Sequence, residues 1–369
     1  MNRVRFVMIG GFLGAGKTTV IGRLARMYVG SGRRVGIVTN DQAANLVDTH
    51  TFRSLGYAVE EIPGSCFCCA FNQLADAIGR LTAAERPDVL LSEPVGSCTD
   101  LVATVVQPLK RLYADRYVTT PLVVLVDPHR ALKILTRAPR GGFSPQAAYI
   151  FEKQLEEADA VAVNKVDAIS ADQWAEVVGV IRQRFSDKPV LSVSGRSGQG
   201  FDELTGLLDG DSRHGEHIPD VDYDTYAEGE AALGWLNSTA TLSGAAPFEL
   251  DGLLVRLLCD IQNRLIERGA EPAHLKVVGA ADGKQAVANL VRSDAQADLS
   301  RSSGHRTTVA QLIVNARVFL DPAELSRVVE ESLRAVCTAG GIELRVDTAQ
   351  SFRPARPVPT YRYAEAIGT

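Results

Sequence analysis

The chain has 369 residues, of which 46% are hydrophobic and 22% charged, and its formal net charge is -5. This length suits two domains that each bury a core, and the mildly acidic balance gives no support for nucleic acid as a partner. The apolar run Phe6–Ile9 is too short for a signal peptide, and no later run approaches the roughly 20 apolar residues of a membrane span. We therefore expect a cytoplasmic protein without a membrane partner.

The first 208 residues repeat one pattern, in which a short apolar or β-branched run is followed by a loop and a segment of helical period. This alternation is typical of α/β domains, and the continuous apolar character of the runs suits strands covered by helices on both faces. Residues 1–208 are therefore predicted to form a doubly wound, mostly parallel sheet. Its expected strands are Arg5–Ile9, Arg34–Thr39, Val59–Ile62, Val89–Ser92, Leu122–Val126, Ala160–Val163 and Val190–Ser194.

An acidic segment, residues 209–230, interrupts this pattern and is interpreted as an interdomain linker or a lightly structured crossing. Residues 231–350 then follow the order βαβββαβ, which predicts a smaller ferredoxin-like α+β domain with one extra strand. Its helices are expected at Phe248–Arg268 and Pro322–Thr338. Residues 351–369, rich in arginine and proline, are expected to form an extended tail that is docked or solvated.

The segment GFLGAGKTT, residues 11–19, matches the P-loop pattern and lies between a predicted strand and a predicted helix. Its backbone N–H groups and the helix N-terminus would surround phosphate groups. Lys17 would reach the β and γ phosphates, and Thr18 would offer its hydroxyl to Mg²⁺. The first domain is thus predicted to be a P-loop NTPase, with nucleotide contacts at Gly11, Gly14, Ala15, Gly16, Lys17, Thr18 and Thr19.

The tetrapeptide NKVD, residues 164–167, follows a predicted strand and resembles the guanine-reading motif of GTPases. The Asp167 carboxylate can accept two N–H donors that guanine offers and adenine lacks, so it would select GTP over ATP. Lys165 would lie along the base. Further along, Ser194, Gly195 and Arg196 would back the base, although a plain glycine-rich loop before a helix explains that segment almost as well.

Three cysteines, Cys66, Cys68 and Cys69, fall within four positions. A reducing compartment keeps thiols free, and residues this close do not bridge easily, so a metal site is favoured over a disulfide. Thiolates are soft ligands that favour Zn²⁺ or Cu(I), accept Co²⁺ or Ni²⁺, and exclude Mg²⁺ and Ca²⁺. A small structural zinc site and a redox pair are the alternatives.

Three thiolates are one ligand short of a closed tetrahedral zinc site. Cys98 is a candidate fourth ligand, with a buried free thiol as the simpler alternative, as for the isolated Cys259 and Cys337. His214 and His217 are further candidates, for which a solvated surface pair is the plainer interpretation.

The segment SEPVG, residues 92–96, stands where P-loop GTPases carry the switch for Mg²⁺ and the γ-phosphate, with Glu93 in place of the usual aspartate. Together with the P-loop, the C-x-C-C and the N-K-x-D, it completes a set of four motifs in one characteristic order. Over about the first 200 residues the chain resembles the CobW-like GTPases, relatives of the urease and hydrogenase nickel-accessory GTPases. Over the remainder the likeness lies in the order of strands and helices alone.

The resemblance implies roles for residues at matching positions, with two departures. Ser65 stands where the family usually has glycine, and Asn40-Asp41 replaces the N-E-F-G switch of many members. The implied assignments are catalysis for Lys17, Asp41 and Glu93; Mg²⁺ for Thr18, Asp41 and Glu93; γ-phosphate sensing for Glu93 and Gly96; guanine for Asn164 and Asp167; and a transition metal for Cys66, Cys68 and Cys69.

The leading hypothesis is a GTP-binding and GTP-hydrolysing metallochaperone that holds Zn²⁺, Co²⁺ or Ni²⁺ and delivers it to a metalloenzyme client, with a homodimer as one candidate assembly. A second is a GTPase that gates loading or repair of a corrinoid on a partner protein, and a third is a zinc-stabilised regulatory GTPase. Because the triplet lies between the predicted switches near Asp41 and Glu93, loss of the γ-phosphate would alter the thiolate geometry and release metal. Slow hydrolysis without a partner is expected, since the sequence offers no obvious arginine finger.

Overall fold

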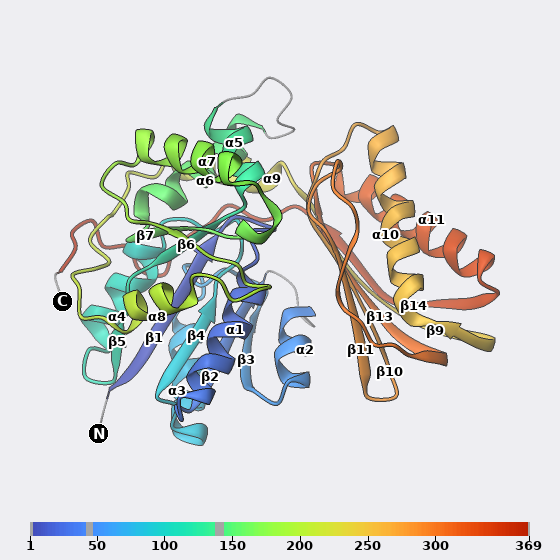
Figure 1. Ribbon diagram of the computed structural model, residues 1–369, viewed down its shortest axis with the longest axis horizontal. Coiled ribbons are helices and arrows are strands. Elements are labelled where there is room, and N and C mark those ends of the chain that lie inside the picture. Colours follow the sequence, from blue (N-terminus) through green and yellow to red (C-terminus); the bar gives the residue numbers. More distant parts are fainter. Residues whose placement is uncertain (1–2, 42–46, 137–143, 368–369) are drawn as a thin grey trace. The chain divides into compact units, whose positions relative to one another are not determined.

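The computed structural model describes residues 3–41, 47–136 and 144–367, and the chain divides into two compact units (Figure 1). The first unit contains Met1–Gly141, Pro145–Ala227 and the residues from Arg356 onward, and the second contains Glu228–Ala355 together with Gly142–Ser144. Within the described part of the chain, no helix combines the length and the apolar character needed to span a membrane.

The first unit is built on a parallel sheet of eight strands among the described residues. Seven of them follow the order β3-β2-β4-β1-β6-β7-β8, and β5 pairs with β1. The predicted doubly wound sheet and its seven strands are confirmed, while the three-residue β5 is too short to show in the sequence pattern. The strands are β1 (Val4–Gly11), β2 (Val35–Asp41), β3 (Ala58–Pro63), β4 (Val89–Glu93), β5 (Tyr117–Thr119), β6 (Val123–Val126), β7 (Ala160–Val163) and β8 (Val190–Ser192).

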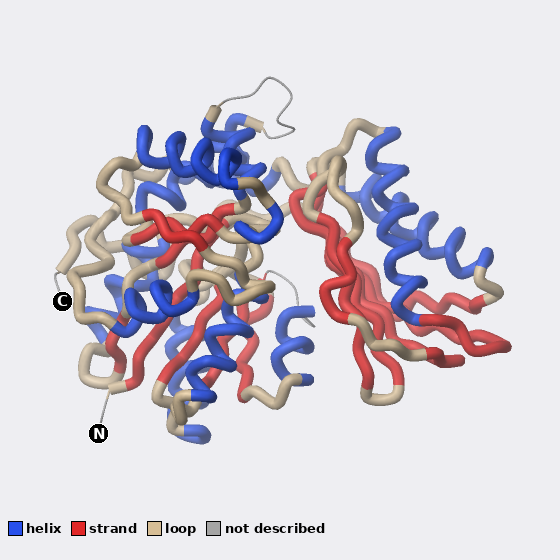
Figure 2. Tube along the Cα trace, in the orientation of Figure 1, coloured by secondary structure: helices blue, strands red, loops and turns tan. Residues whose placement is uncertain are grey.

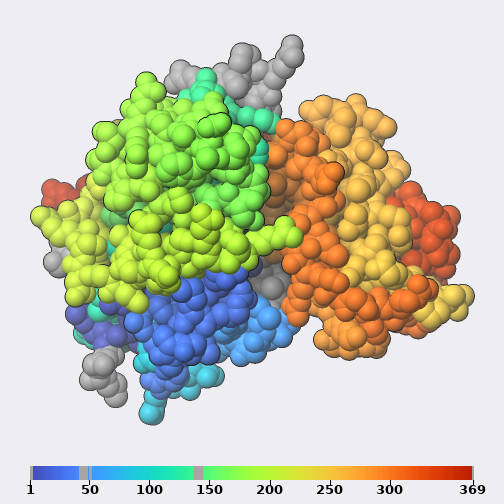
Figure 3. Space-filling view, viewed as in Figure 1, coloured from blue at the N-terminus to red at the C-terminus, as the bar shows by residue number. Residues whose placement is uncertain are grey.

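Helices cover both faces of this sheet. Val7 and Ile9 of β1 pack in one cluster with apolar residues of the first helix, and Phe6 and Met8, which point to the opposite face, are buried too. On the face seen in Figure 3, the blue and green segments that contain α1, α7 and α8 form the surface of this unit. The helices are α1 (Lys17–Gly30), α2 (Val47–Ser54), α3 (Phe71–Glu85), η1 (Val102–Val106), α4 (Gln107–Leu112), α5 (Pro128–Leu135), α6 (Pro145–Glu157), η2 (Val166–Ala168), α7 (Ala171–Arg184) and α8 (Phe201–Asp209).

The second unit is an antiparallel sheet with the order β12-β11-β10-β13-β9-β14 and two helices on one of its faces (Figure 1). Strands β14, β9, β13 and β10 reproduce the ferredoxin-like order, as predicted, and the sheet continues through two extra strands rather than one. The additional β12 is short and polar, so no apolar alternation marks it in the sequence. The elements are β9 (Gly234–Glu249), α10 (Leu250–Glu267), β10 (Pro272–Ala281), β11 (Lys284–Leu290), β12 (Asp298–Arg301), β13 (Arg306–Val318), α11 (Pro322–Ala339) and β14 (Ile342–Phe352).

The structure corrects one segment of the predicted domain map and decides between the alternatives for another. The interpretation of residues 209–230 as a linker or a lightly structured crossing is wrong at its end, because α9 (Tyr223–Ala231) begins there and buries Tyr226 completely. The residues after β14 are drawn as loop in Figure 2, and those from Arg356 onward belong to the first unit, so the extended tail is docked and not solvated. Neither segment has the long apolar period that would reveal its packing in the sequence.

Candidate functional site

The phosphate-binding loop lies between β1 and α1, where the sequence places it. Gly11, Gly14 and Gly16 adopt φ values of 131, 77 and 95°, a region that favours glycine. A Cβ on Gly16 would lie 2.4 Å from Asn164 Nδ2, so that position has no room for a side chain. Lys17 is buried and its Nζ donates to the Gly11 carbonyl at 2.8 Å. The loop thus presents backbone N–H groups and one ammonium group, which suit a phosphate.

An oxygen-rich pair lies at the start of α1. Thr18 Oγ1 donates to Glu93 Oε1 at 2.9 Å, and the Glu93 side chain at the end of β4 is buried. A hydroxyl and a carboxylate side by side next to a phosphate loop are suitable ligands for Mg²⁺. Gly96 packs on the same loop, since a Cβ there would lie 2.8 Å from Leu13 Cδ2. Asp41 is the last residue of β2, and its side chain, with the predicted Mg²⁺ contact, lies outside the described residues.

The predicted base-reading residues come together beside the phosphate loop. Asn164 Nδ2 donates to the Ala15 carbonyl at 2.8 Å, and Asn164 Oδ1 accepts from the Gly195 N–H at 3.0 Å. Ser194 Oγ donates to Asp167 Oδ1 at 2.6 Å, and the Asp167 side chain is exposed. These hydrogen bonds join the NKVD segment to the phosphate loop and to the last loop. Of the remaining predicted nucleotide residues, Thr19 lies in the first turn of α1 and Arg196 is exposed in the last loop.

Asp127 and Arg130 contact Lys165 and the phosphate loop, and they were not among the predicted site residues. Lys165 Nζ donates to the Gly14 carbonyl at 2.8 Å and pairs with Asp127 at 2.9 Å. Burial alone would raise the pKa of Asp127, but Lys165 and Arg130 hold that pKa well below its usual range. Arg130 is buried, donates to the Leu13 carbonyl and lies over the Phe12 ring. A carboxylate directly after a strand and before a proline is the sequence signal for Asp127.

The three clustered cysteines lie in the turn between β3 and α3. The Cys66 and Cys68 sulfur atoms are 2.8 Å apart, Cys66 and Cys69 are 3.3 Å apart, and Cys68 and Cys69 are 3.7 Å apart. Within the described ranges, this triplet is the only group of three or more cysteine, histidine or acidic residues close enough to hold a metal ion. Three convergent sulfur atoms form a soft donor set that fits Zn²⁺ and excludes Mg²⁺.

A buried amide holds the cysteine turn on the end of β2. Asn40 Nδ2 donates to the Ile62 carbonyl at 2.9 Å and to the Ser65 carbonyl at 2.6 Å, and Asn40 Oδ1 accepts from the Phe67 N–H at 2.9 Å. Asn40 immediately precedes Asp41, the predicted Mg²⁺ contact. The strand that leads toward the nucleotide side therefore also fixes the geometry of the thiols.

Cys98 approaches the triplet from the segment that follows Glu93. It is buried, and its thiol is a hydrogen-bond partner of both Cys66 and Cys68. Hydrogen bonds with the Cys68, Cys69 and Cys98 thiols hold the pKa of Cys66 well below its usual range, whereas contact with Cys66 raises the pKa of Cys69 to about 11. A metal ion that binds these sulfur atoms displaces the protons that they still carry.

The two histidines do not join this cluster. His214 is buried, which corrects the interpretation of a solvated pair, and its Nδ1 and Nε2 contact the Ser212 carbonyl at 2.7 Å and Thr119 Oγ1 at 3.0 Å. Burial lowers its pKa. His217 is exposed, with its Nδ1 4.0 Å from Asp187. Both His214 nitrogens are thus occupied by hydrogen-bond partners.

Two residues of α6 make hydrogen bonds to the segment that begins at Gly96. Gln154 Nε2 donates to the Gly96 carbonyl at 3.1 Å and to the Cys98 carbonyl at 2.7 Å. Glu157 is fully buried and accepts from Thr99 Oγ1 at 3.1 Å and from the Val102 N–H at 3.0 Å. Burial raises the pKa of Glu157 to about 8. No sequence pattern indicates these contacts, because both residues look like ordinary polar positions of an amphipathic helix.

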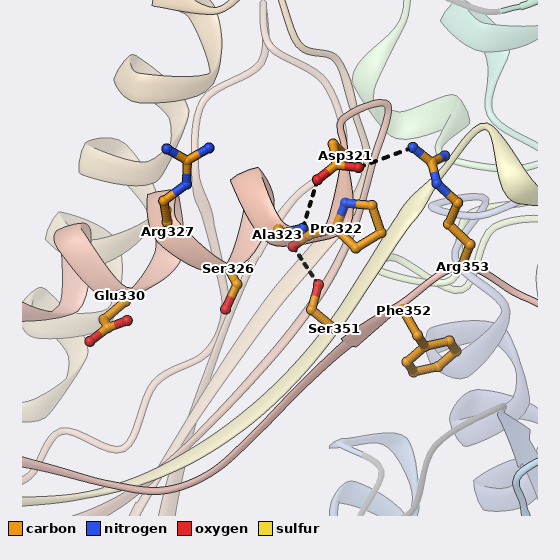
Figure 4. A pocket seen from close by; sticks show the side chains of 9 residues that line it. All are labelled: Asp321, Pro322, Ala323, Ser326, Arg327, Glu330, Ser351, Phe352 and Arg353. Carbon is orange, nitrogen blue, oxygen red and sulfur yellow. Dashed lines mark hydrogen bonds and ion pairs between the residues drawn. The ribbon is translucent and has the colours of Figure 1, made fainter.

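The second unit carries a surface pocket beside the start of α11, with Ser351, Phe352 and Arg353 along one side (Figure 4). Asp321 caps the helix by accepting from the Ala323 N–H at 2.9 Å and pairs with Arg353 at 3.5 Å. All of its lining residues belong to the second unit, whereas the thiols and the phosphate loop belong to the first.

A parallel sheet whose first strand leads through a glycine loop and a buried lysine into a helix defines a P-loop nucleotide-binding protein. Residues 5–191 match the model of the family described as "CobW/HypB/UreG, nucleotide-binding domain". The chain belongs to the CobW/HypB/UreG family, as its four motifs indicate.

Curated relatives match about half of the chain. The zinc chaperone CobW of Sinorhizobium sp is 28% identical over 52% of this chain and 58% of its own length. The zinc chaperone YeiR of Escherichia coli strain K12 is 28% identical over 50% of this chain and 53% of its own length. The chain thus spans little more than half of either relative. Among solved structures, HypB from Helicobacter pylori in complex with nickel aligns with 56% of this chain and 85% of that one, at 19% identity and a TM-score of 0.41.

Proposed function

We propose that this protein is a GTP-binding and GTP-hydrolysing metallochaperone whose cysteine cluster binds Zn²⁺ and delivers it to a client metalloenzyme. The observation that carries the proposal is the position of the thiols between two segments that also lead to the nucleotide site, the end of β2 and the segment after β4. Asn40 fixes the cysteine turn to the end of β2, and Cys98 comes from the segment that starts at Glu93. The "zinc chaperone" names of the relatives favour zinc over cobalt or nickel.

In the nucleotide site, Lys17 would bind the β and γ phosphates, and Asp167 would accept the N–H donors of guanine with Ser194 holding its carboxylate. Thr18, Glu93 and Asp41 would hold Mg²⁺, which neutralises developing phosphate charge when bound. In the hydrolysis step, water attacks the γ-phosphorus, the bond to the β-γ bridging oxygen breaks, and GDP and phosphate leave.

In the metal site, Cys66, Cys68 and Cys69 would bind Zn²⁺ with Cys98 as the fourth ligand, which completes a tetrahedral sulfur site. Because Cys98 lies two residues after Gly96, a shift of that segment on loss of the γ-phosphate would remove one ligand from the metal. An ion held by three thiolates is then open to a ligand from the client.

Burial of Cys66 and Cys68 also favours a second candidate, in which zinc only stabilises a regulatory GTPase. Chelation separates the two functions. A chaperone keeps its fold when the metal is removed and loses only client activation, whereas a zinc-stabilised domain unfolds. The corrinoid alternative predicts a client that binds only when its corrinoid is present.

The test of the proposal combines metal counting with nucleotide hydrolysis in the full chain. We expect one Zn²⁺ per chain for the wild type, loss of that Zn²⁺ in Cys68→Ser, and unchanged binding in Cys259→Ser, whose cysteine is exposed and remote in sequence. We also expect GTP, and not ATP, to be hydrolysed. Equal zinc content in Cys68→Ser and wild type would overturn the metal site, and no hydrolysis with any candidate client present would overturn the GTPase.

A further inference from the structure

The end of the chain lies directly on the cysteine turn. The Val358 N–H donates to Cys69 Sγ at 3.2 Å, the Thr360 N–H donates to the Cys68 carbonyl at 2.9 Å, and Thr360 Oγ1 donates to the Cys69 carbonyl at 2.8 Å. We call residues 356–367 the C-terminal strap. Cys69 is the only partly exposed member of the triplet, and its sulfur atom accepts the hydrogen bond from the strap.

The strap is anchored on both sides of this contact. The Tyr361 ring packs edge-on against Phe71, the first residue of α3, with ring centroids 5.5 Å apart. Further along, Arg111 of α4 donates to the Glu365 carbonyl at 2.7 Å and lies over the Tyr363 ring at 4.5 Å. These contacts along its length show that the strap packs on the first unit as part of its folded structure.

An ion pair between a half-buried arginine and a buried carboxylate joins the strap to the segment that carries Cys98. Arg362 Nε donates to Asp100 Oδ2 at 2.7 Å, and the Asp100 side chain is fully buried. Tyr223 Oη donates to the same carboxylate at 2.6 Å. Asp100 has a φ of 64°, a left-handed conformation that costs energy for a non-glycine residue and persists because these contacts hold it.

We propose that the C-terminal strap is the outer wall of the metal site and controls exchange of the metal bound there, an inference that rests on the proposed zinc site. The Val358 N–H orients the Cys69 sulfur, and a hydrogen bond from outside the ligand set tightens metal binding. Metal leaves, or passes to a client, when the strap lifts. Val358 and Arg362 are therefore positioning residues of the site.

The Asp100–Arg362 pair gives the strap a connection to the nucleotide. Gly96 packs on Leu13 of the phosphate loop, and Cys98 and Asp100 follow within four residues. A shift of Gly96 on loss of the γ-phosphate would displace Asp100 and loosen Arg362, so the metal ligand Cys98 and the strap would be released together.

The test measures the rate at which Zn²⁺ passes from the loaded full-length protein to a chromophoric chelator. Val358→Pro removes the N–H that contacts Cys69, and Val358→Ala keeps it. Arg362→Ala removes the ion pair, and Arg334→Ala, which breaks an exposed pair with Glu330 in the second unit, is its control. We expect about tenfold faster release for Val358→Pro and Arg362→Ala, and wild-type rates for both controls.

A second readout follows alkylation of Cys69 in the metal-free protein, which should also accelerate in Val358→Pro and Arg362→Ala. Wild-type rates of zinc release in both variants would overturn the proposal, with circular dichroism confirming that they are folded. If the wild type binds no Zn²⁺ through its cysteines, the proposed function fails, and the strap's control of metal exchange fails with it. Zinc content that depends on Cys68 combined with unchanged release rates instead overturns the strap alone.

Discussion

At the scale of single residues, the proposed selection of guanine depends on one carboxylate. Asp167 is exposed and held by Ser194, so it can accept guanine N–H groups without rearrangement. We expect Asp167→Ala to weaken GTP binding by about 1.5–3 kcal/mol and to leave ATP binding unchanged, since only guanine loses its partner. Competition between the two nucleotides for a fluorescent analogue measures this. Asp172→Ala, an exposed acid at the start of α7, is the control, and an equal loss for GTP and ATP would contradict the assignment.

Glu157 makes stability depend on pH. Its pKa is raised by burial from 4.5 to about 8, so the folded chain binds a proton that the unfolded chain releases as pH rises between these values. The stabilisation is fully present below about pH 4.5 and is lost as pH rises through about 8. Glu157→Gln, which copies the protonated carboxyl, should therefore flatten the fall in melting temperature between pH 6 and pH 9.

The matched control for this change is Glu156→Gln, whose side chain is more exposed and pairs with Lys153. It should keep the wild-type pH profile. Identical slopes for Glu157→Gln and the wild type would show that Glu157 is ionised in the folded chain, and the raised pKa would then be wrong.

At the scale of elements, the Asn40 side chain joins β2 to the cysteine turn through hydrogen bonds. Removing its three hydrogen bonds with Asn40→Ala should weaken Zn²⁺ binding by about tenfold to a hundredfold, the usual cost of losing an amide that orients metal ligands. Chelator competition gives the affinity. Asn289→Ala, which removes one hydrogen bond to Ser300 in the second unit, should have no effect. Equal affinities for Asn40→Ala and Asn289→Ala would contradict the link.

Sequence patterns predicted the elements and motifs that can be recognised from their own neighbouring residues. Strands such as Ala160–Val163 have continuous apolar character, and the P-loop and NKVD have fixed spacing, so both were correctly placed. Contacts between distant segments leave no such signal. The pairing of Arg362 with Asp100 joins residues 262 positions apart, and the helix at Tyr223 lies in a segment dominated by acids and glycines. Their partners become visible only in the folded chain.

At the scale of the whole molecule, the division into units is uneven in sequence. The second unit, Glu228–Ala355, contains an apolar core formed by its own sheet and by α10 and α11. We expect a fragment of these residues to fold by itself with a cooperative thermal transition. A second-unit fragment that stays unfolded would contradict the independence of this core.

A chain ending at Ala227 lacks the strap and should bind Zn²⁺ more loosely than the full protein.

The central claim is that the nucleotide and the metal are coupled through the segments that carry Asn40 and Cys98. Its most direct test is the affinity of the full-length protein for Zn²⁺, measured by competition with a chromophoric chelator in the presence of a non-hydrolysable GTP analogue or of GDP. We predict an affinity at least about tenfold lower with GDP, which corresponds to a coupling free energy of about 1.4 kcal/mol. Equal affinities in the two nucleotide states would contradict the claim, because a nucleotide with no differential effect on the metal site cannot drive metal release.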